Sequence, residues 1–164
     1  MAIITSLIGE LKHEASNTRK ILLCVPDEMF DWKPHEKSMS LSQLANHIAE
    51  LPRWIHYMMT GTGFNFVQEP FKRLKATSKS ELIEGFDAII REAVELLEKA
   101  NDEELAVQWK LSRGEVVIFE LPRKVAIRNL VMNHIIHHRG QLSVYLRLLN
   151  VPVPGLYGPS ADER

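Results

Sequence analysis

The sequence has little of what secreted, membrane or disulfide-stabilised proteins require. Cys24 is the single cysteine among 164 residues, so no intrachain disulfide can form and nothing indicates an oxidising compartment. No apolar run approaches the roughly 18 residues of a membrane span. The first residues lack the basic and apolar regions of a secretory signal. These absences predict a cytoplasmic protein without a membrane partner.

Charge of either sign is also not in excess. The chain has 20 Lys and Arg against 21 Asp and Glu, a formal net charge of −1, and no polybasic run. A large electrostatic surface for nucleic acid is therefore not expected. Hydrophobic residues make up 45% and charged residues 25%, as in an ordinary globular protein. Length and composition together predict one domain over residues 1–164.

Apolar residues recur at helical spacing in long segments of the chain, which predicts an all-α protein built as a four-helix bundle. The predicted helices cover residues 3–24, about 40–60, about 78–100 and about 122–149. Ser40 and Gln43 fit a capping box at the start of the second helix. Pro52 lies inside that helix and is expected to kink it or end it early.

The segments between these helices have a different pattern. Residues 25–40 and 60–77 are expected to be loops. Between residues 105 and 120 apolar and polar side chains alternate on both sides of the turn sequence Ser112-Arg113-Gly114-Glu115. This alternation predicts a short β-hairpin before the last helix.

Histidine is the unusual component of this sequence, with seven residues in all, and His134, His137 and His138 fall within five positions. At about 100° per residue, His134 and His138 lie on the apolar stripe of the fourth predicted helix and His137 lies at its edge. Two imidazoles at i and i+4 can share one metal ion. Alternatively, they are buried histidines that hydrogen-bond to the backbone or to each other.

His47 is the candidate third ligand. It lies on the flank of the apolar face of the second predicted helix, with Leu44 and Leu51 one turn away on either side. Such a histidine is either a satisfied core residue or a ligand, and the pair on another helix favours the ligand. Three histidines leave the fourth position of a tetrahedral metal open to water or substrate, as in catalytic sites.

The neighbouring polar residues suggest further roles, but no catalytic residue can be assigned. Glu50 could act as a base, although a solvated helix face is the preferred interpretation. Arg139 is expected in a surface or interface ion pair, with an anionic substrate or a packed helix as alternative partners. Asn46, Asn133 and Gln141 could orient ligand histidines or make ordinary structural hydrogen bonds.

Several segments, taken together and in this order, resemble the DinB/YfiT-like superfamily. They are residues 32–41 (WKPHEKSMSL), 44–50 (LANHIAE), 133–142 (NHIIHHRGQL) and 154–163 (PGLYGPSADE). The resemblance implies a four-helix bundle with an up-down-down-up arrangement, often as a homodimer. It also implies a divalent metal, commonly zinc or nickel, held by His47, His134 and His138.

The resemblance further implies a function. Characterised members include transferases and isomerases that use low-molecular-weight thiols such as bacillithiol or mycothiol. The implied function is therefore a metal-dependent transferase that acts on a small-molecule substrate with such a thiol. One alternative is a metal-dependent hydrolase that uses bound hydroxide. The other is a non-enzymatic, metal-stabilised bundle that binds a ligand or partner in a stress response.

Overall fold

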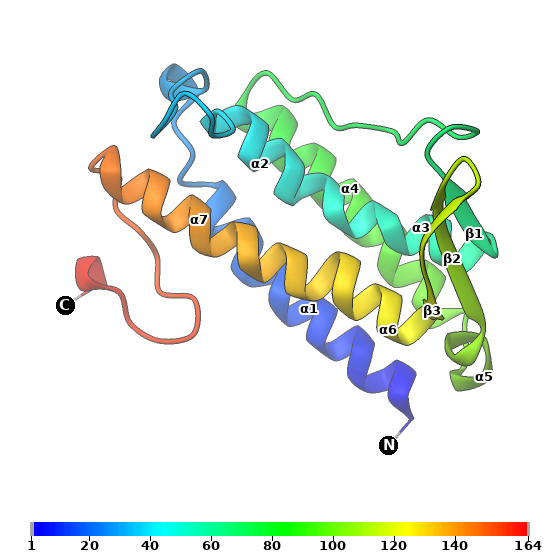
Figure 1. Ribbon diagram of the computed structural model, residues 1–164. Helices are drawn as coiled ribbons and strands as arrows, with labels where there is room; N and C mark the ends of the chain where they lie inside the picture. The colour runs from blue at the N-terminus through cyan, green and yellow to red at the C-terminus, as the bar shows by residue number, and fades with distance from the viewer. Residues whose placement is uncertain (1, 164) are drawn as a thin grey trace.

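The protein is mostly helical, with long helices lying side by side and a small β-sheet at one end (Figure 1). The computed structural model describes residues 2–163. The main helices are α1 (Ile3–Leu22), α2 (Leu41–Glu50), α3 (Trp54–Thr60), α4 (Lys79–Glu98), α6 (Arg123–Ile127) and α7 (His134–Leu148). The helix α1 packs against α4 and α7, and α2 packs against the same two helices. The site described below lies where α2 meets α7.

Local sequence signals explain where the helices begin and end. The hydroxyl of Ser40 accepts a hydrogen bond from the backbone N–H of Gln43, whose side chain accepts one from the backbone of Ser40. The predicted capping box is therefore confirmed. Pro52 divides the second predicted helix, because a 3₁₀ turn, Leu51–Arg53, separates α2 from α3. Ser78 caps α4 by accepting from the backbone N–H of Glu81.

The predicted hairpin is present, but the sheet is larger than expected. Strands β2 (Gln108–Arg113) and β3 (Val116–Pro122) pair antiparallel, and β1 (Gly63–Asn65) pairs with β2 in parallel. The prediction of a loop over the whole of residues 60–77 is thus wrong at β1. Gly63 allows this pairing, because a Cβ there would lie 2.7 Å from the carbonyl oxygen of Lys110. A short helix, α5 (Asp102–Ala106), precedes β2.

The last predicted helix is interrupted. A π-helical segment, Arg128–Asn133, separates α6 from α7. A π segment fits one extra residue into the helix and so shifts the phase of all residues after it. This shift matters for the histidines, which begin directly after the segment.

Apolar side chains fill the space between the helices in two clusters. One lies near the sheet, where Trp109 is fully buried and its indole N–H donates to the carbonyl oxygen of Tyr57 at 3.2 Å. The other lies between the opposite ends of the long helices and includes Leu44, Phe86 and Leu142. Among residues 2–163, no helix is both long and apolar enough to cross a membrane.

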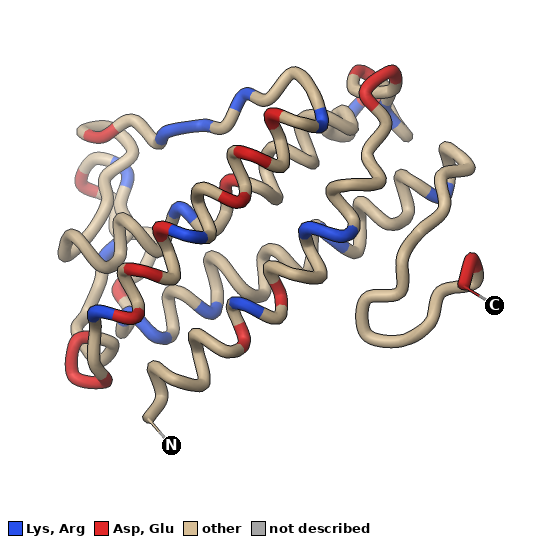
Figure 2. Tube along the Cα trace, turned by 180° about the vertical axis from the view of Figure 1, so that it is seen from behind, with Lys and Arg blue, Asp and Glu red and all other residues tan. Residues whose placement is uncertain are grey.

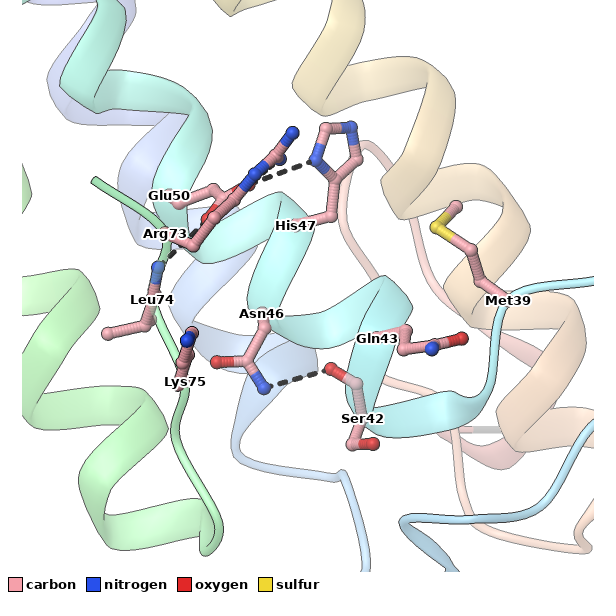
Figure 3. A pocket seen from close by; sticks show the side chains of 9 residues that line it. All are labelled: Met39, Ser42, Gln43, Asn46, His47, Glu50, Arg73, Leu74 and Lys75. Atoms are coloured by element: carbon pink, nitrogen blue, oxygen red, sulfur yellow. Dashed lines mark hydrogen bonds and ion pairs between the residues drawn. The ribbon is translucent and has the colours of Figure 1, made fainter. Parts of the chain in front are cut away.

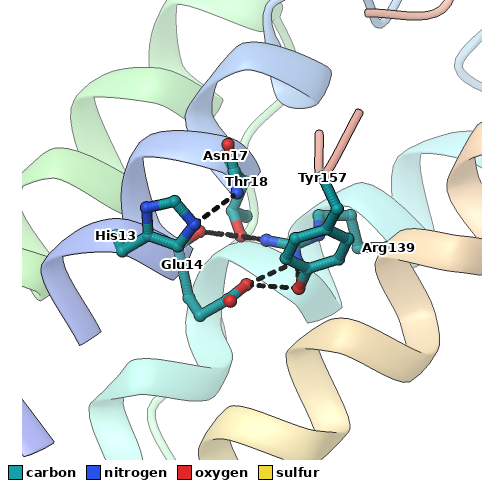
Figure 4. Close-up of polar contacts among 6 residues, drawn as sticks. All are labelled: His13, Glu14, Asn17, Thr18, Arg139 and Tyr157. Carbon is teal, nitrogen blue, oxygen red and sulfur yellow. Dashed lines mark hydrogen bonds and ion pairs between the residues drawn. The ribbon is translucent and has the colours of Figure 1, made fainter. Parts of the chain in front are cut away.

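A buried ion pair joins α7 to α1. Arg139 is only 1% exposed, and its guanidinium donates to the carboxylate of Glu14 at 2.5 Å and to the hydroxyl of Thr18 at 3.0 Å. Tyr157 reaches the pair from the C-terminal segment, and its hydroxyl donates to the same carboxylate at 2.7 Å (Figure 4). A surface position for Arg139 is therefore wrong, and its ion-pair partner is a packed helix, one of the alternatives that the sequence left open.

Candidate metal centre

The structure brings His47, His134 and His138 together from two helices. His47 lies on α2, and the other two occupy adjacent turns of α7. One nitrogen from each ring lies within 4.8 Å of the others. In the part of the chain that the structure describes, no other group of three or more His, Cys, Asp or Glu residues gathers in this way.

The geometry of the cluster suits a common cation. The Nε2 atoms of His47 and His134 are 3.5 Å apart. Two ligands of a tetrahedral zinc ion, each about 2.05 Å from the metal, are about 3.4 Å apart. The ring centroid of His138 lies 4.7 Å from both other rings. The third nitrogen, on His138, lies within 4.8 Å of the other two, so the residues present fit a metal ion.

Each ring has a second partner, which leaves one nitrogen available to the cluster. The Nδ1 of His47 lies 3.4 Å from Oε1 of Glu50, and the Nδ1 of His138 lies 2.7 Å from Oε1 of Gln141. The ring of His134 is hydrogen-bonded to the backbone of Leu130. Outer partners of this kind fix the tautomer and orientation of histidine ligands.

Burial keeps two of the rings neutral. Burial is the main reason why the pKa of His134 falls from 6.5 to about 4, and charge repulsion from His138 and His47 contributes to the same decrease. Burial also lowers the pKa of His138, although its bond to Gln141 opposes the change. A neutral imidazole carries the lone pair that a metal needs. At neutral pH, protons therefore compete little for these two ligand positions.

Glu50 is the acidic residue beside the cluster, and it is buried. Its side chain is 3% exposed and accepts bonds from the His47 ring, from Arg73 and from the backbone N–H of Leu74. The preferred interpretation of Glu50 as part of a solvated helix face is wrong. Although burial tends to raise the pKa of this carboxyl, the donors around it outweigh burial and lower the pKa overall.

A cavity of about 610 Å³ opens beside His47. Its floor is α2, one side is the segment that carries Arg73 and Lys75, and Met39 lies on the other side (Figure 3). The volume falls within the range of small-molecule sites, about 300–1,000 Å³. A ligand in this cavity would thus lie next to one of the three histidines.

The histidines do not face the core as the periodicity predicted. The buried residues of α7 are Ile135, Arg139, Leu142 and Leu146, whose centre lies about 110° from His134 at 100° per residue. His134 and His138 are half-buried on the side of α7 that faces α2. The prediction averaged apolar positions across the π segment, whose extra residue moves Ile127 from about 90° away to about 10° from the centre of the buried face of α7.

The remaining histidines lie outside the cluster. His137 is exposed and shares the amide of Gln141 with His138, its Nε2 being 3.2 Å from Nε2 of Gln141. His13 and His35 are exposed, and His56 is partly exposed and paired with Glu92 at 2.8 Å.

Arg73 and Lys75 lie near the site, although no sequence pattern predicted that they would. Their segment follows a loop of no regular pattern, so only the fold shows that it lies against α2. The contact between Glu50 and His47 could have been predicted, because Glu50 follows His47 by three positions and residues three apart on a helix are neighbours.

Comparisons with known proteins agree with this architecture. The model of the DinB family matches residues 4–164. The chain is 25% identical over 153 residues to the uncharacterized protein YrdA of Bacillus subtilis, covering 92% of this chain and 85% of YrdA. It is 26% identical over 134 residues to the uncharacterized protein YjoA of the same organism, covering 79% and 80% of the two chains.

Solved structures show the same fold. The crystal structure of the DinB-like protein YjoA from Bacillus subtilis superposes with a TM-score of 0.71 and 20% identity, over 94% of this chain and 99% of that one. A DinB-like protein from Bacillus cereus gives a TM-score of 0.65 and 23% identity, over 89% and 92%. With a family match over almost the whole sequence and a shared fold, the chain belongs to the DinB family.

Proposed function

We propose that this protein binds one divalent metal ion, zinc or nickel, through His47, His134 and His138, and transfers a low-molecular-weight thiol to an electrophilic substrate. The observation that carries the proposal is the convergence of three imidazole nitrogens within 4.8 Å beside a cavity of about 610 Å³. We also propose that the long helices form a four-helix bundle in the up-down-down-up order of the family, and that the protein assembles as a homodimer.

Three protein ligands favour catalysis over a purely structural metal site. A structural zinc site is closed by four protein ligands, whereas a catalytic site keeps one position for water or substrate. No fourth His, Cys, Asp or Glu joins the cluster among residues 2–163. The cavity beside His47 is the natural direction from which a further ligand would approach.

The residues around the cluster support a thiol as the nucleophile. A divalent ion at this site would lower the pKa of a bound thiol or water. The oxygens of Glu50 already accept bonds from His47, Arg73 and Leu74, so Glu50 is not free to act as a general base. A thiol depends less on such a base than water does, because it is far more acidic.

Transfer of a thiol to an electrophilic carbon needs no oxidant. The thiol proton passes to solvent, sulfur forms a bond to the electrophilic carbon, and the leaving group departs with the bonding electron pair. The chain's histidines serve as ligands and do not transfer protons. Glu50 and Gln141 hold two of them in orientation.

A metal titration followed by a thiol screen tests the proposal. Protein purified without an affinity tag is stripped with a chelator, reloaded with zinc, nickel or cobalt, and incubated with a thiol and an aryl chloride. We expect transfer that requires the metal and is lost in His138→Ala. Transfer at an unchanged rate after metal removal would refute the mechanism, and turnover of an ester without any thiol would instead favour the hydrolase.

A further inference from the structure

The cavity beside the metal centre has a positively charged side. The segment between β1 and α4 carries three cationic residues within four positions, Lys72, Arg73 and Lys75, and Figure 2 shows this basic stretch along the molecule. Two of them, Arg73 and Lys75, line the cavity. With Glu50 as the one acidic residue of the lining, its formal charge is +1 before any metal binds.

Two polar side chains of α2 hold this segment in place. The amide of Asn46 donates to the carbonyl oxygen of Ala76 at 3.0 Å and accepts from its N–H at 2.8 Å. One turn further along α2, the carboxylate of Glu50 accepts from the backbone N–H of Leu74 at 2.9 Å. These contacts lie on either side of Lys75 in the segment. They fix the backbone from which its side chain extends, so the flexible side chain starts from a defined point beside the cavity.

The two cations differ in their partners. The guanidinium of Arg73 is paired with Glu50, whose charge it offsets. Lys75 is exposed, and within residues 2–163 no carboxylate lies within ion-pair distance of its ammonium group. The positive charge that remains in the lining is therefore that of Lys75.

The rest of the lining combines apolar and neutral polar groups. Met39 and Leu74 offer apolar surface on opposite sides of the cavity, while Ser42 and Gln43 lie on its floor (Figure 3). A ligand that matches this arrangement has an apolar body and an anionic end. Lysine is a flexible point charge that accepts either a carboxylate or a phosphate.

We propose that the cavity binds small molecules with an apolar body and a terminal oxyanion, a carboxylate or a phosphate, recognised by Lys75. This proposal deepens the proposed function. It rests on that function only where it takes the bound molecule to be the substrate or the thiol. The oxyanion site itself needs no metal. Its existence can therefore be tested separately from catalysis.

Calorimetric titration of the metal-free protein tests the site. Octanoate, octyl phosphate and uncharged 1-octanol are compared on wild type, Lys75→Met, Lys75→Arg and Lys99→Met, the last being an exposed lysine outside the cavity. We expect octanoate to bind more tightly than 1-octanol. Lys75→Met should weaken octanoate binding about two- to fivefold, the range of an exposed ion pair. Lys75→Arg should restore most of the affinity.

The other outcomes are equally defined. Tighter binding of octyl phosphate than of octanoate, lost in Lys75→Met, supports the oxyanion site and assigns phosphate instead of carboxylate. The proposal is overturned if neither octanoate nor octyl phosphate binds at millimolar concentration. It is also overturned if Lys75→Met binds octanoate as wild type does, or if Lys99→Met weakens it equally.

A second titration separates this proposal from the proposed function. The cobalt-loaded protein is titrated with 6-mercaptohexanoate and 6-mercaptohexanol while the cobalt–thiolate absorption is recorded. If neither thiol produces the band but octanoate binding depends on Lys75, the thiol chemistry fails and the oxyanion site stands. If both thiols produce it with equal affinity in wild type and Lys75→Met, the thiol chemistry stands and the oxyanion site fails.

Discussion

Replacing Arg139 by Met should destabilise the protein strongly, because Arg139 is the buried partner of a buried acid. Its side chain is 1% exposed, and that of Glu14 is 8% exposed. The guanidinium makes bonds to the carboxylate and carbonyl oxygen of Glu14 and to the hydroxyl of Thr18. After the substitution, the carboxylate of Glu14 still accepts a hydrogen bond from the hydroxyl of Tyr157, at 2.7 Å.

The magnitude follows from what remains buried. Removing one partner of a buried ion pair costs about 3–5 kcal/mol, since the other charge stays desolvated. Methionine fills much of the arginine's volume, so the cavity term is small. The hydroxyl of Tyr157 offsets part of the loss. We therefore expect a decrease of about 3 kcal/mol in the free energy of unfolding.

Urea denaturation of the metal-free protein measures this effect, and a double variant checks its cause. Arg139→Met with Glu14→Leu removes both charges and should recover most of the lost stability. Arg19→Met is the matched control, because Arg19 pairs with Asp87 at the surface and its loss should change stability much less. A decrease below about 1 kcal/mol for Arg139→Met, or a double variant no more stable than the single one, would refute the reasoning.

Three further predictions concern the metal centre. His138→Ala should lose bound metal, whereas His137→Ala should retain it, as measured by elemental analysis; the reverse result would disprove the assignment of ligands. Glu50→Gln should weaken metal affinity about 10–100-fold in a competitive chelator titration, because Glu50 orients His47, and unchanged affinity would exclude that role. Metal-free protein should lose about 1–2 kcal/mol of stability as pH falls from 6.5 to about 4, because the folded state binds fewer protons at His134 than the unfolded state does and the ring is only half-buried. His134→Asn should abolish this part of the pH dependence in urea titrations at pH 7 and 4.5, and an unchanged slope would contradict the shifted pKa.

Elements governed by local chemistry were predictable from the sequence. The capping box at Ser40 and the break at Pro52 depend on atoms within a few residues, and the structure contains both. The gathering of His47, His134 and His138 was also predictable. His134 and His138 lie one turn apart on one helix, and His47 joins them as soon as its own helix packs against that one.

Features that depend on distant partners were not predictable in this way. Strand β1 exists because Gly63 meets Lys110, far along the chain. Glu50 was predicted on a solvated helix face and Arg139 in a surface or interface ion pair, because charged side chains are rarely buried. Only their tertiary partners explain why both are buried. The spacing of apolar residues does not indicate the π segment, so the predicted orientation of the histidines on α7 was wrong.

The π segment gives the two halves of the last helix independent phases. Deleting Asn129 would convert Arg128–Asn133 to ordinary helix and turn His134 and His138 by about 100° relative to α6. The imidazoles could then meet α2 only if the sheet end of the molecule repacked. The one extra residue of the π segment therefore lets α6 pack its apolar side chains near the sheet while α7 directs His134 and His138 toward α2.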